Sequence, residues 1–401
     1  MALASPACGD DDTGPEEVFE PCRVSPTVDV TFDLDTANPT PQIHADFAFA
    51  AGQIWMAYNI VDGEGEGRFD VFLSAFECDG SIVGSAQRVT TTLGGNDIEP
   101  AISRRGDNLY IAWSSDNSGA ENNLDALYRG FASDGTPLTD SDLVIETTLD
   151  GNPVVANTWK PRVAGLADGE LALVGTRGID NSFQTFIQRM TAEGEYLGEA
   201  IDVEDRGNTH DAPVIAATAD GDLFSAWSRV DGNGDSVVWY GYIAADGDGF
   251  SFGPRMATTG LSSAPSLVTD RERGFAYLAV RDDASQDIVL MAVDANGEVA
   301  RTPLGIAGVS DHSPIVVTSP TGGAVGWYRN VSGIRNRFMV QRFDFDGSTL
   351  TLAQEQDLGT DGAVSVYSPA LTHIGDDIYF AAWSEGNSPE FFVKGRAVAT
   401  R

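Results

Sequence analysis

A strand-like stretch that ends in a tight turn recurs six times along the chain, and this repeat limits what the chain can fold into. The clearest copy is FMVQRFDFDG, which ends at Gly347, and the others end at Gly80, Gly135, Gly194, Gly247 and Gly297. An acidic or amide residue before glycine supplies the positive-φ positions that a tight β-hairpin turn needs. Successive copies lie 55, 59, 53, 50 and 50 residues apart. This period is typical of kelch-sized propeller blades and not of helical solenoids.

A second block precedes each of these hairpins and consists of two short strands joined by a glycine or acidic turn. Its seven copies begin at His44, Pro100, Pro161, Pro213, Pro265, Pro314 and Pro369. Their aligned last positions hold Tyr58, Trp113, Gly175, Trp227, Val280, Trp327 and Trp383. Together the two blocks give four strands per unit, here called A to D, and the runs are rich in β-branched and aromatic residues. The sequence therefore predicts an all-β, seven-bladed β-propeller with four-stranded antiparallel blades.

The repeat fills the chain and predicts one domain over residues 26–401, after a signal remnant or acidic tether at residues 1–25. The expected blades are 43–92, 97–150, 159–205, 210–259, 263–305, 311–361 and 366–400. The seventh unit has no strand D of its own, whereas VDVTFDLD at Val28–Asp35 has no unit. We expect this N-terminal strand to complete the last blade and close the ring.

The first residues, MALASPACGDDDTGPEE, resemble the tail of a bacterial lipoprotein signal, although Ser5 stands where leucine is usual. CGDDD starts of this kind are similar to those of myxobacterial-type lipoproteins, and the resemblance implies that Cys8 is lipidated. An acidic N-terminus with an incidental cysteine is the alternative. The remaining cysteines, Cys22 and Cys78, form an even pair in a chain expected in an oxidising compartment, so we predict a disulfide between them. Two buried thiols are the alternative.

Strand C and its turn, as in FMVQRFDFDG and TFIQRMTAEGEYLG, resemble the VYVQRFDADG-type repeats of secreted bacterial propeller proteins and adhesins. The resemblance extends over nearly all of residues 40–401. It implies a secreted or cell-surface protein and no common activity, because a fold does not by itself specify a function.

The charge of the chain excludes one class of partner. Asp and Glu outnumber Lys and Arg by 60 to 24, and the formal net charge is −36. Such a surface repels phosphate backbones, so nucleic acid is not an expected partner. No run of 18 apolar residues is present, and a lipid anchor is the expected membrane attachment. We expect a monomer.

One loop carries the pattern of a calcium chelate. In VDGNGDS, Asp231, Asn233 and Asp235 present oxygen ligands at alternate positions, as calcium loops do. The pattern is incomplete, because Ser236 occupies the usual glycine position and Tyr242 the usual acidic twelfth position. Calcium is the only cofactor that the sequence suggests, and a polar solvent loop is the alternative.

Four arginines recur at the end of strand B, at Arg177, Arg229, Arg281 and Arg329, spaced 52, 52 and 48 residues apart. If their register is shared, their guanidinium groups project on one face and bind a carboxylate or sulfate. The alternative is that each arginine pairs with a nearby acid and tethers a loop.

The entries to strand A hold further polar residues near the expected channel mouth: His44, His210 with Asp211, Asp311 with His312, Asp97 with Glu99, and Trp159 with Lys160. Imidazoles beside carboxylates bind metals or exchange protons, and they also cap strand ends. From this set we predict ligand contacts for His210, His312 and Trp159.

Enzyme signatures such as G-x-S-x-G, H-E-x-x-H and the P-loop are absent from the sequence. We therefore predict a non-catalytic extracellular binding or scaffold propeller, whose ligand is a glycan, a surface protein or an anion on the face of the B–C and D–A loops. The alternative is a propeller glycoside hydrolase or polysaccharide lyase that uses Asp, Glu or His at the channel mouth. A purely structural envelope protein is a third possibility.

Overall fold

The computed structural model describes residues 20–28, 31–33, 42–61, 68–91, 95–116, 124–145, 147–149, 152–154, 158–166, 169–179, 182–203, 209–231, 233–306, 309–332, 335–358, 363–364, 369–387 and 390–400. Cys8 lies outside them. The described residues form strands and turns without an α-helix, and no helix among them is long and apolar enough to cross a membrane.

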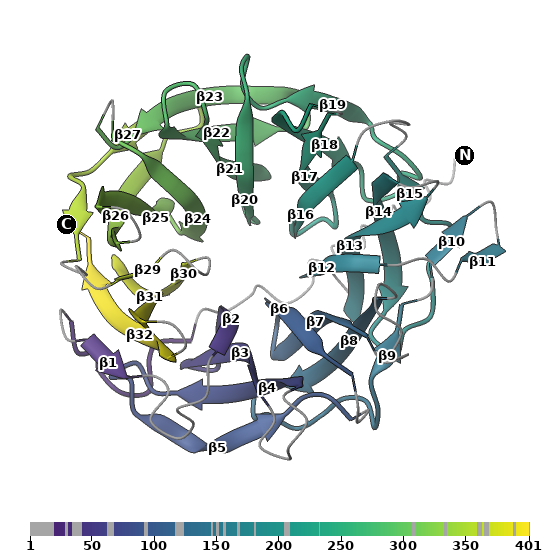
Figure 1. The fold of residues 1–401 in the computed structure, drawn as a ribbon, viewed down its shortest axis with the longest axis horizontal. Coiled ribbons are helices and arrows are strands. Elements are labelled where there is room, and N and C mark those ends of the chain that lie inside the picture. The colour runs from purple at the N-terminus through teal and green to yellow at the C-terminus, as the bar shows by residue number, and fades with distance from the viewer. Residues whose placement is uncertain are drawn as a thin grey trace, which may run out of the picture.

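Seven antiparallel blades surround a central channel, as predicted (Figure 1). Blade 1 contains β2 (Gln42–Ala50), β3 (Gln53–Val61), β4 (Phe69–Phe76) and β5 (Ile82–Arg88). Blade 2 contains β6 (Asp97–Arg105), β7 (Asn108–Ser115), β8 (Asp125–Ala132) and β9 (Leu143–Val144). Blade 3 contains β12 (Thr158–Gly165), β13 (Glu170–Ile179), β14 (Ser182–Thr191) and β15 (Ile201–Asp202). Blade 4 contains β16 (Thr209–Ala217), β17 (Leu223–Val230), β18 (Ser236–Ile243) and β19 (Phe252–Met256).

The last three blades repeat this order. Blade 5 contains β20 (Ser262–Asp270), β21 (Phe275–Asp282), β22 (Asp287–Asp294) and β23 (Gly297–Leu304). Blade 6 contains β24 (Asp311–Ser319), β25 (Gly322–Ser332) and β26 (Arg335–Phe345), with its outer strand in two pieces, β27 (Leu350–Leu352) and β28 (Gln356–Asp357). Blade 7 contains β30 (Ala370–Gly375), β31 (Ile378–Asn387) and β32 (Glu390–Ala399), and β29 (Ala363–Val364) links it to blade 6.

The N-terminal strand closes the ring, as predicted. β1 (Thr31–Asp33) pairs antiparallel with β32, with Thr31 opposite Arg396 and Asp33 opposite Lys394. It therefore supplies the outer strand of blade 7, and Figure 1 shows it beside β32. The predicted disulfide is also present: Cys22 and Cys78 are bonded, with their Cα atoms 5.9 Å apart. The cross-link fastens the segment that leads into β1 to blade 1.

Large apolar side chains at the end of strand B fill the space between neighbouring blades. Trp113, Trp227, Trp327 and Trp383 are at most 3% exposed. In blade 3 this position is Gly175, and a Cβ there would lie 3.0 Å from the ring of Phe186. The fully buried Phe186 therefore occupies the volume that tryptophan fills elsewhere, so the interface stays packed without the repeat residue.

A β-bulge interrupts the pairing of strands A and B in blades 1 to 6. In blades 2 to 6, the residue before the strand-A proline has a positive φ: Glu99 (56°), Lys160 (51°), Ala212 (46°), Ala264 (51°) and Ser313 (52°). A non-glycine residue in the left-handed region is uncommon, and bulges redirect side chains. In blades 2 to 6, a bulge with a positive-φ residue therefore recurs near the start of the inner strand.

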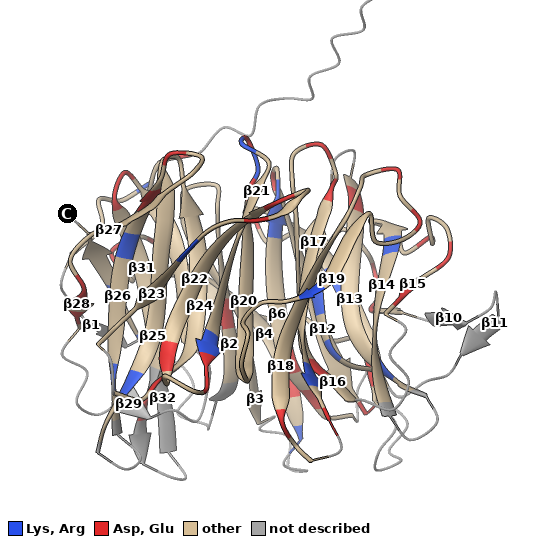
Figure 2. Cartoon of the chain, turned by 90° about the horizontal axis from the view of Figure 1, so that it is seen from above, with Lys and Arg blue, Asp and Glu red and all other residues tan. Residues whose placement is uncertain are grey.

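One element was not predicted from the repeat. A short hairpin of β10 (Thr147–Leu149) and β11 (Asn152–Val154) is inserted between blades 2 and 3, and Figure 1 shows it projecting from the rim. Figure 2 shows that the acidic residues gather at the turns on both ends of the propeller, whereas the strands between them carry few charges. The charge of the chain therefore lies mainly outside the blade interfaces.

Removing the disulfide is expected to destabilise the closed ring. The bond spans 56 residues, and a cross-link of this span contributes about 2–4 kcal/mol, mainly by restricting the unfolded chain. We expect the Cys22→Ser, Cys78→Ser variant to lose about this much free energy of unfolding in guanidinium titrations. Reductant should lower the stability of the wild-type protein to that of the variant and leave the variant unchanged. Equal stabilities of the oxidised wild type and the variant would contradict this role.

Candidate functional site

The strand-A entries line one mouth of the central channel. The seven A strands, β2, β6, β12, β16, β20, β24 and β30, surround the channel (Figure 1). Each begins opposite the end of its strand B; in blade 3, for example, Thr158 pairs with Arg177. The first residues of the A strands therefore share one end of the channel with the B–C and D–A loops.

Polar side chains from three successive blades are linked at this mouth. The Trp159 Nε1–H of blade 3 donates to Glu99 Oε2 of blade 2 at 2.8 Å. On the other side, Lys160 Nζ lies 2.7 Å from Asp211 Oδ1 of blade 4. Both partners of each contact are accessible in part, and the Asp211 side chain is 49% exposed. The result is an open, polar line across blades 2 to 4.

Trp159 adds an aromatic surface to this line. Its ring meets Phe183 edge-on, with centroids 6.0 Å apart and an interplanar angle of 82°. Lys160 Nζ lies 5.6 Å from the Trp159 ring centroid, within the range of a cation–π interaction. These neighbours orient the indole while it remains partly exposed.

His44 and Arg162 extend the line across the channel. Burial lowers the pKa of His44, Glu99 raises it, and Arg162 and Lys160 lower it. His44 belongs to blade 1 and the two cations to blade 3, and these blades are not neighbours. The charges of Glu99, Lys160 and Arg162 therefore act on His44 from blades 2 and 3. We call His44, Glu99, Trp159, Lys160, Arg162 and Asp211 the channel-mouth group.

The opposite end of the channel is crossed by an arginine. Arg271 lies in the A–B turn of blade 5, and its Nη2 is 3.4 Å from the carbonyl oxygens of both Arg104 in blade 2 and Gly165 in blade 3. The side chain therefore reaches from one side of the ring to the other. A ligand of the channel-mouth group is expected to enter from the face of the B–C and D–A loops.

Two of the four predicted anion-binding arginines are committed to acids of their own blades. Arg177 has no exposed side-chain surface and pairs with Asp202. Arg329 makes two bidentate ion pairs, with the Asp311 oxygens at 2.9 Å each and with Glu355 at 2.5 and 2.8 Å. The Arg177 side chain therefore offers no exposed surface to a ligand, and the two ion pairs of Arg329 support the alternative, a structural role.

The other two arginines differ from these in partner and in register. Arg229 lies with its guanidinium carbon 5.3 Å from the Trp239 ring centroid, and Arg281 Nε lies 3.3 Å from Asp283 Oδ1. Arg177, Arg229 and Arg329 each come two residues after the strand-B position that faces the bulge, whereas Arg281 comes one residue after it. Because side chains alternate along a strand, Arg281 projects to the other face of its blade. The condition that all four arginines share one register is therefore not met by Arg281.

The two histidines predicted to bind ligand are held by the protein itself. His210 is 2% exposed and its Nδ1 accepts the Thr185 N–H at 3.0 Å, so the ligand contact predicted for it does not fit this position. His312 is partly exposed, and its ring nitrogens contact Asn336 Oδ1 at 3.0 Å and Ser313 Oγ at 3.1 Å. Burial lowers the pKa of His312.

The predicted calcium loop is a closed turn. Asp231 Oδ1 accepts the backbone N–H groups of Asn233 at 2.8 Å and Asp235 at 3.1 Å. These hydrogen bonds lower the pKa of Asp231, which is fully exposed. Within the described part of the chain, no group of three or more His, Cys, Asp or Glu residues is placed to hold a metal ion. A calcium site at Asp231, Asn233 and Asp235 stays a prediction.

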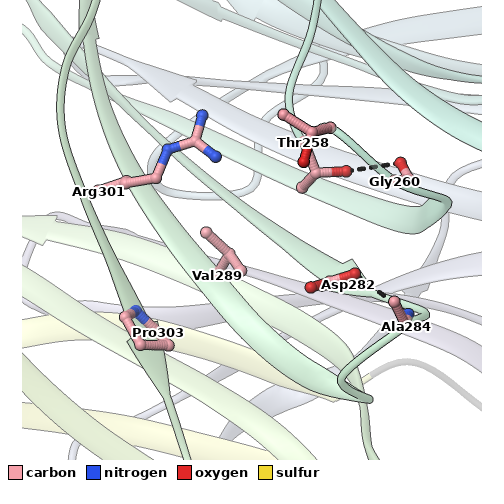
Figure 3. A pocket seen from close by; sticks show the side chains of 8 residues that line it. Thr258, Gly260, Asp282, Ala284, Val289, Arg301 and Pro303 are labelled. Carbon is pink, nitrogen blue, oxygen red and sulfur yellow. Dashed lines mark hydrogen bonds between the residues drawn. The ribbon is translucent and has the colours of Figure 1, made fainter.

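A second hollow lies on the same face at the junction of blades 4 and 5. It is a pocket of about 240 Å³ lined by Thr258, Thr259, Gly260, Asp282, Ala284, Val289, Arg301 and Pro303 (Figure 3). Thr258 Oγ1 donates to the Gly260 carbonyl at 2.9 Å, and Asp282 Oδ1 accepts the Ala284 N–H at 3.1 Å. Arg301 is paired with Glu298. The residues that line this pocket include no aromatic side chain, whereas the partly exposed Trp159 lies at the channel mouth, so the channel mouth is the better candidate for a saccharide.

Comparison with known proteins gives only the fold. The chain matches no protein-family model and no curated protein. Among solved structures, it is similar to the Hadza microbial sialidase Hz136 (13% identity, TM-score 0.47, 86% of this chain and 76% of that one) and to Trypanosoma rangeli sialidase (11%, 0.48, 95% and 58%). It is also similar to a protein of unknown function from Dyadobacter fermentans (11%, 0.52, 77% and 95%). The chain spans just over half the length of the Trypanosoma rangeli protein.

Arg162 was not among the predicted site residues, although the repeat contains a signal for it. The residue after the strand-A proline is Ala101, Val214, Ser266, Ile315 or Ala370 in the other blades that have this proline. Blade 3 alone places a charged residue there. A charged residue at a strand-A position that is uncharged in the other blades is therefore a sequence signal for a functional side chain.

The Arg329 ion pairs are expected to be structural. Asp311 is fully buried, so Arg329→Met leaves an uncompensated buried carboxylate and should lower the free energy of unfolding by about 3–5 kcal/mol. The matched control is Arg281→Met, which breaks a partly exposed pair and should cost less than about 1 kcal/mol. Guanidinium unfolding measures both. Equal losses would show that the two arginines are not different in role.

Asp97 should make stability depend on pH. It is 1% exposed, and burial, with smaller effects of Asp70 and Asp142, raises its pKa to about 7, although Ser115 and Trp113 oppose the shift. Between pH 4 and pH 7 the folded state keeps a proton that the unfolded state releases. The stabilisation is therefore full below pH 4 and is lost as pH rises to 7.

The Asp97→Asn variant lacks this dependence. Relative to the variant, the wild-type protein should lose on the order of 2 kcal/mol between pH 5 and pH 8, as measured by chemical unfolding at both pH values. Both proteins have the same other carboxylates, so the pH dependence that arises from these groups does not appear in the difference between the two stabilities. Parallel stability curves for the two proteins would exclude a raised pKa at this position.

Proposed function

We propose that this protein is a non-catalytic extracellular or cell-surface binding propeller, and that its ligand is a saccharide held at the channel mouth. The observation that carries the proposal is the partly exposed Trp159, with Glu99, Lys160 and Asp211 around it from three blades. An aromatic face beside a few oriented polar groups is the usual composition of a small-molecule site. The apolar face of a sugar ring packs on the indole, and its hydroxyls bond to the carboxylates and the ammonium.

The geometry favours a ligand-binding role for these side chains over a purely structural one. Glu99 and Lys160 both occupy the positive-φ bulge position that recurs in blades 2 to 6. The bulges fix where these side chains enter the channel, so the site is formed before the ligand arrives. A preformed site loses less conformational freedom on binding.

An extracellular setting is supported by the Cys22–Cys78 disulfide, because such bonds persist in oxidising compartments. Attachment through a lipidated Cys8 is part of the same proposal. A tethered, strongly acidic propeller suits a role at the cell surface, where it binds extracellular glycan.

Trp159→Ala should abolish saccharide binding and leave the fold intact, since the ring is partly exposed. An aromatic stacking contact at a binding site supports a loss of at least about tenfold in affinity. Glycan-array binding followed by calorimetry on the best ligand measures this, with circular dichroism to check folding. Trp159→Phe is the matched control and should retain most of the affinity. Unchanged binding by the Ala variant would place the ligand elsewhere.

The same ligand also tests the enzymatic alternative. After prolonged incubation with the wild-type protein, the proposal expects the saccharide to be recovered intact by chromatography. Shortened products that appear with the wild type and not with a Glu99→Gln, Asp211→Asn variant would replace the binding role with a hydrolase or lyase.

A further inference from the structure

Arg162, on an inner strand, forms no ion pair with an acidic side chain of the described residues. Arg162 Nη1 donates to two backbone carbonyls, those of Pro161 at 3.0 Å and Glu99 at 3.5 Å. Throughout the described ranges, no carboxylate lies within ion-pair distance of this guanidinium. Arg129 and Arg189 likewise donate to backbone carbonyls, with no ion pair among the described residues. They lie on strand C of their blades, whereas Arg162 lies on the innermost strand of its blade.

The position of Arg162 directs this charge into the channel. The residue follows the strand-A proline of the innermost strand β12, and its side chain reaches back to blade 2. It also acts electrostatically on His44 and Asp46 of blade 1. No ion pair joins Arg162 to Asp46, whose oxygens accept the N–H groups of Phe47 at 2.9 Å and Ile102 at 3.1 Å.

A second cation stands next to it. Lys160 is two residues before Arg162 on the same strand, and its partner Asp211 is half exposed. A solvent-exposed ion pair contributes little free energy and is exchanged easily. An incoming anion can therefore share the Lys160 ammonium, or replace Asp211 on it, at little cost.

We infer that the ligand of the channel mouth is an acidic saccharide, whose carboxylate or sulfate group binds between the Arg162 guanidinium and the Lys160 ammonium while its sugar ring packs on Trp159. This inference rests on the proposed function and names its ligand class. The planar guanidinium presents paired N–H donors to two oxygens of one anion. The overall charge of −36 opposes anions in general, so the site selects a saccharide that the indole also holds.

The test compares matched saccharides at constant ionic strength by calorimetry. The probes are oligosaccharides of a hexuronic acid, the same oligosaccharides after reduction of the carboxyl groups, and sulfated oligosaccharides. The wild-type protein should bind an acidic probe about tenfold more tightly than the reduced one, since hydrogen bonds to charged groups are roughly twice as strong as those to neutral groups. Preference for the sulfated over the uronic probe would identify the anion as sulfate.

Variants then locate the anion. Arg162→Gln should lose the preference for acidic probes and retain the weaker binding of the reduced probe, and Arg162→Lys should restore part of the preference. The matched control is Arg255→Gln, which removes the same charge from an exposed position on the outer strand β19 and should leave the preference unchanged.

The outcomes separate the two claims. Equal binding of acidic and reduced probes by the wild type overturns the acidic-ligand inference and leaves the binding function standing. An acidic preference that survives in Arg162→Gln overturns the assignment of Arg162. Failure of the wild-type protein to bind any of the three probes, or any saccharide on a glycan array, overturns the proposed function itself.

Discussion

The requirement that both faces of every blade be covered governs this structure. Each sheet is apolar on both sides, so each must pack against two neighbours, and this is possible for all seven only if the ring closes. At the closing seam, Phe47 of blade 1 lies 6.0 Å from Phe380 of blade 7, ring centroid to ring centroid. β1 pairs with β32 at this seam, and the disulfide fastens the preceding segment to blade 1. The closure thus combines packing, strand pairing and a covalent bond.

Closure of the ring also creates the candidate site. The inner strands meet only around the channel, and a bulge turns their first residues toward its mouth. Residues that are 61 positions apart in the sequence, such as Glu99 and Lys160, become neighbours there because each occupies the same bulge position in adjacent blades. The repeat therefore supplies equivalent positions, and the function depends on the few blades in which those positions hold charged or aromatic residues.

The candidate site was predictable in kind but not in its members. The entries to strand A were correctly expected at the channel mouth, and Trp159 lies there with an accessible ring. Arg177 and His210, at equally suggestive sequence positions, are buried: Arg177 is paired with Asp202 of its own blade, and His210 accepts a hydrogen bond from Thr185 of blade 3. Arg281 is displaced by one residue in register, and along a strand one residue decides which face a side chain occupies. The four arginines were predicted from their spacing in the sequence, and this spacing does not reveal a shift of one residue in strand register.

The sequence by itself determined the architecture of this protein: the blade count, the four strands per blade, the closing strand and the cysteine pair all follow from a repeat of turns and apolar runs. Those features depend on turns and apolar runs formed by residues that are close together in the sequence, so they can be predicted without knowledge of the tertiary contacts. The tertiary structure alone decided which polar residues are available to a ligand. Arg162 and Arg329 are both arginines on repeat strands. Arg329 is paired with two carboxylates of its own blade, whereas Arg162 contacts the backbone of the neighbouring blade, and only the folded chain decides which partners lie within reach of each side chain.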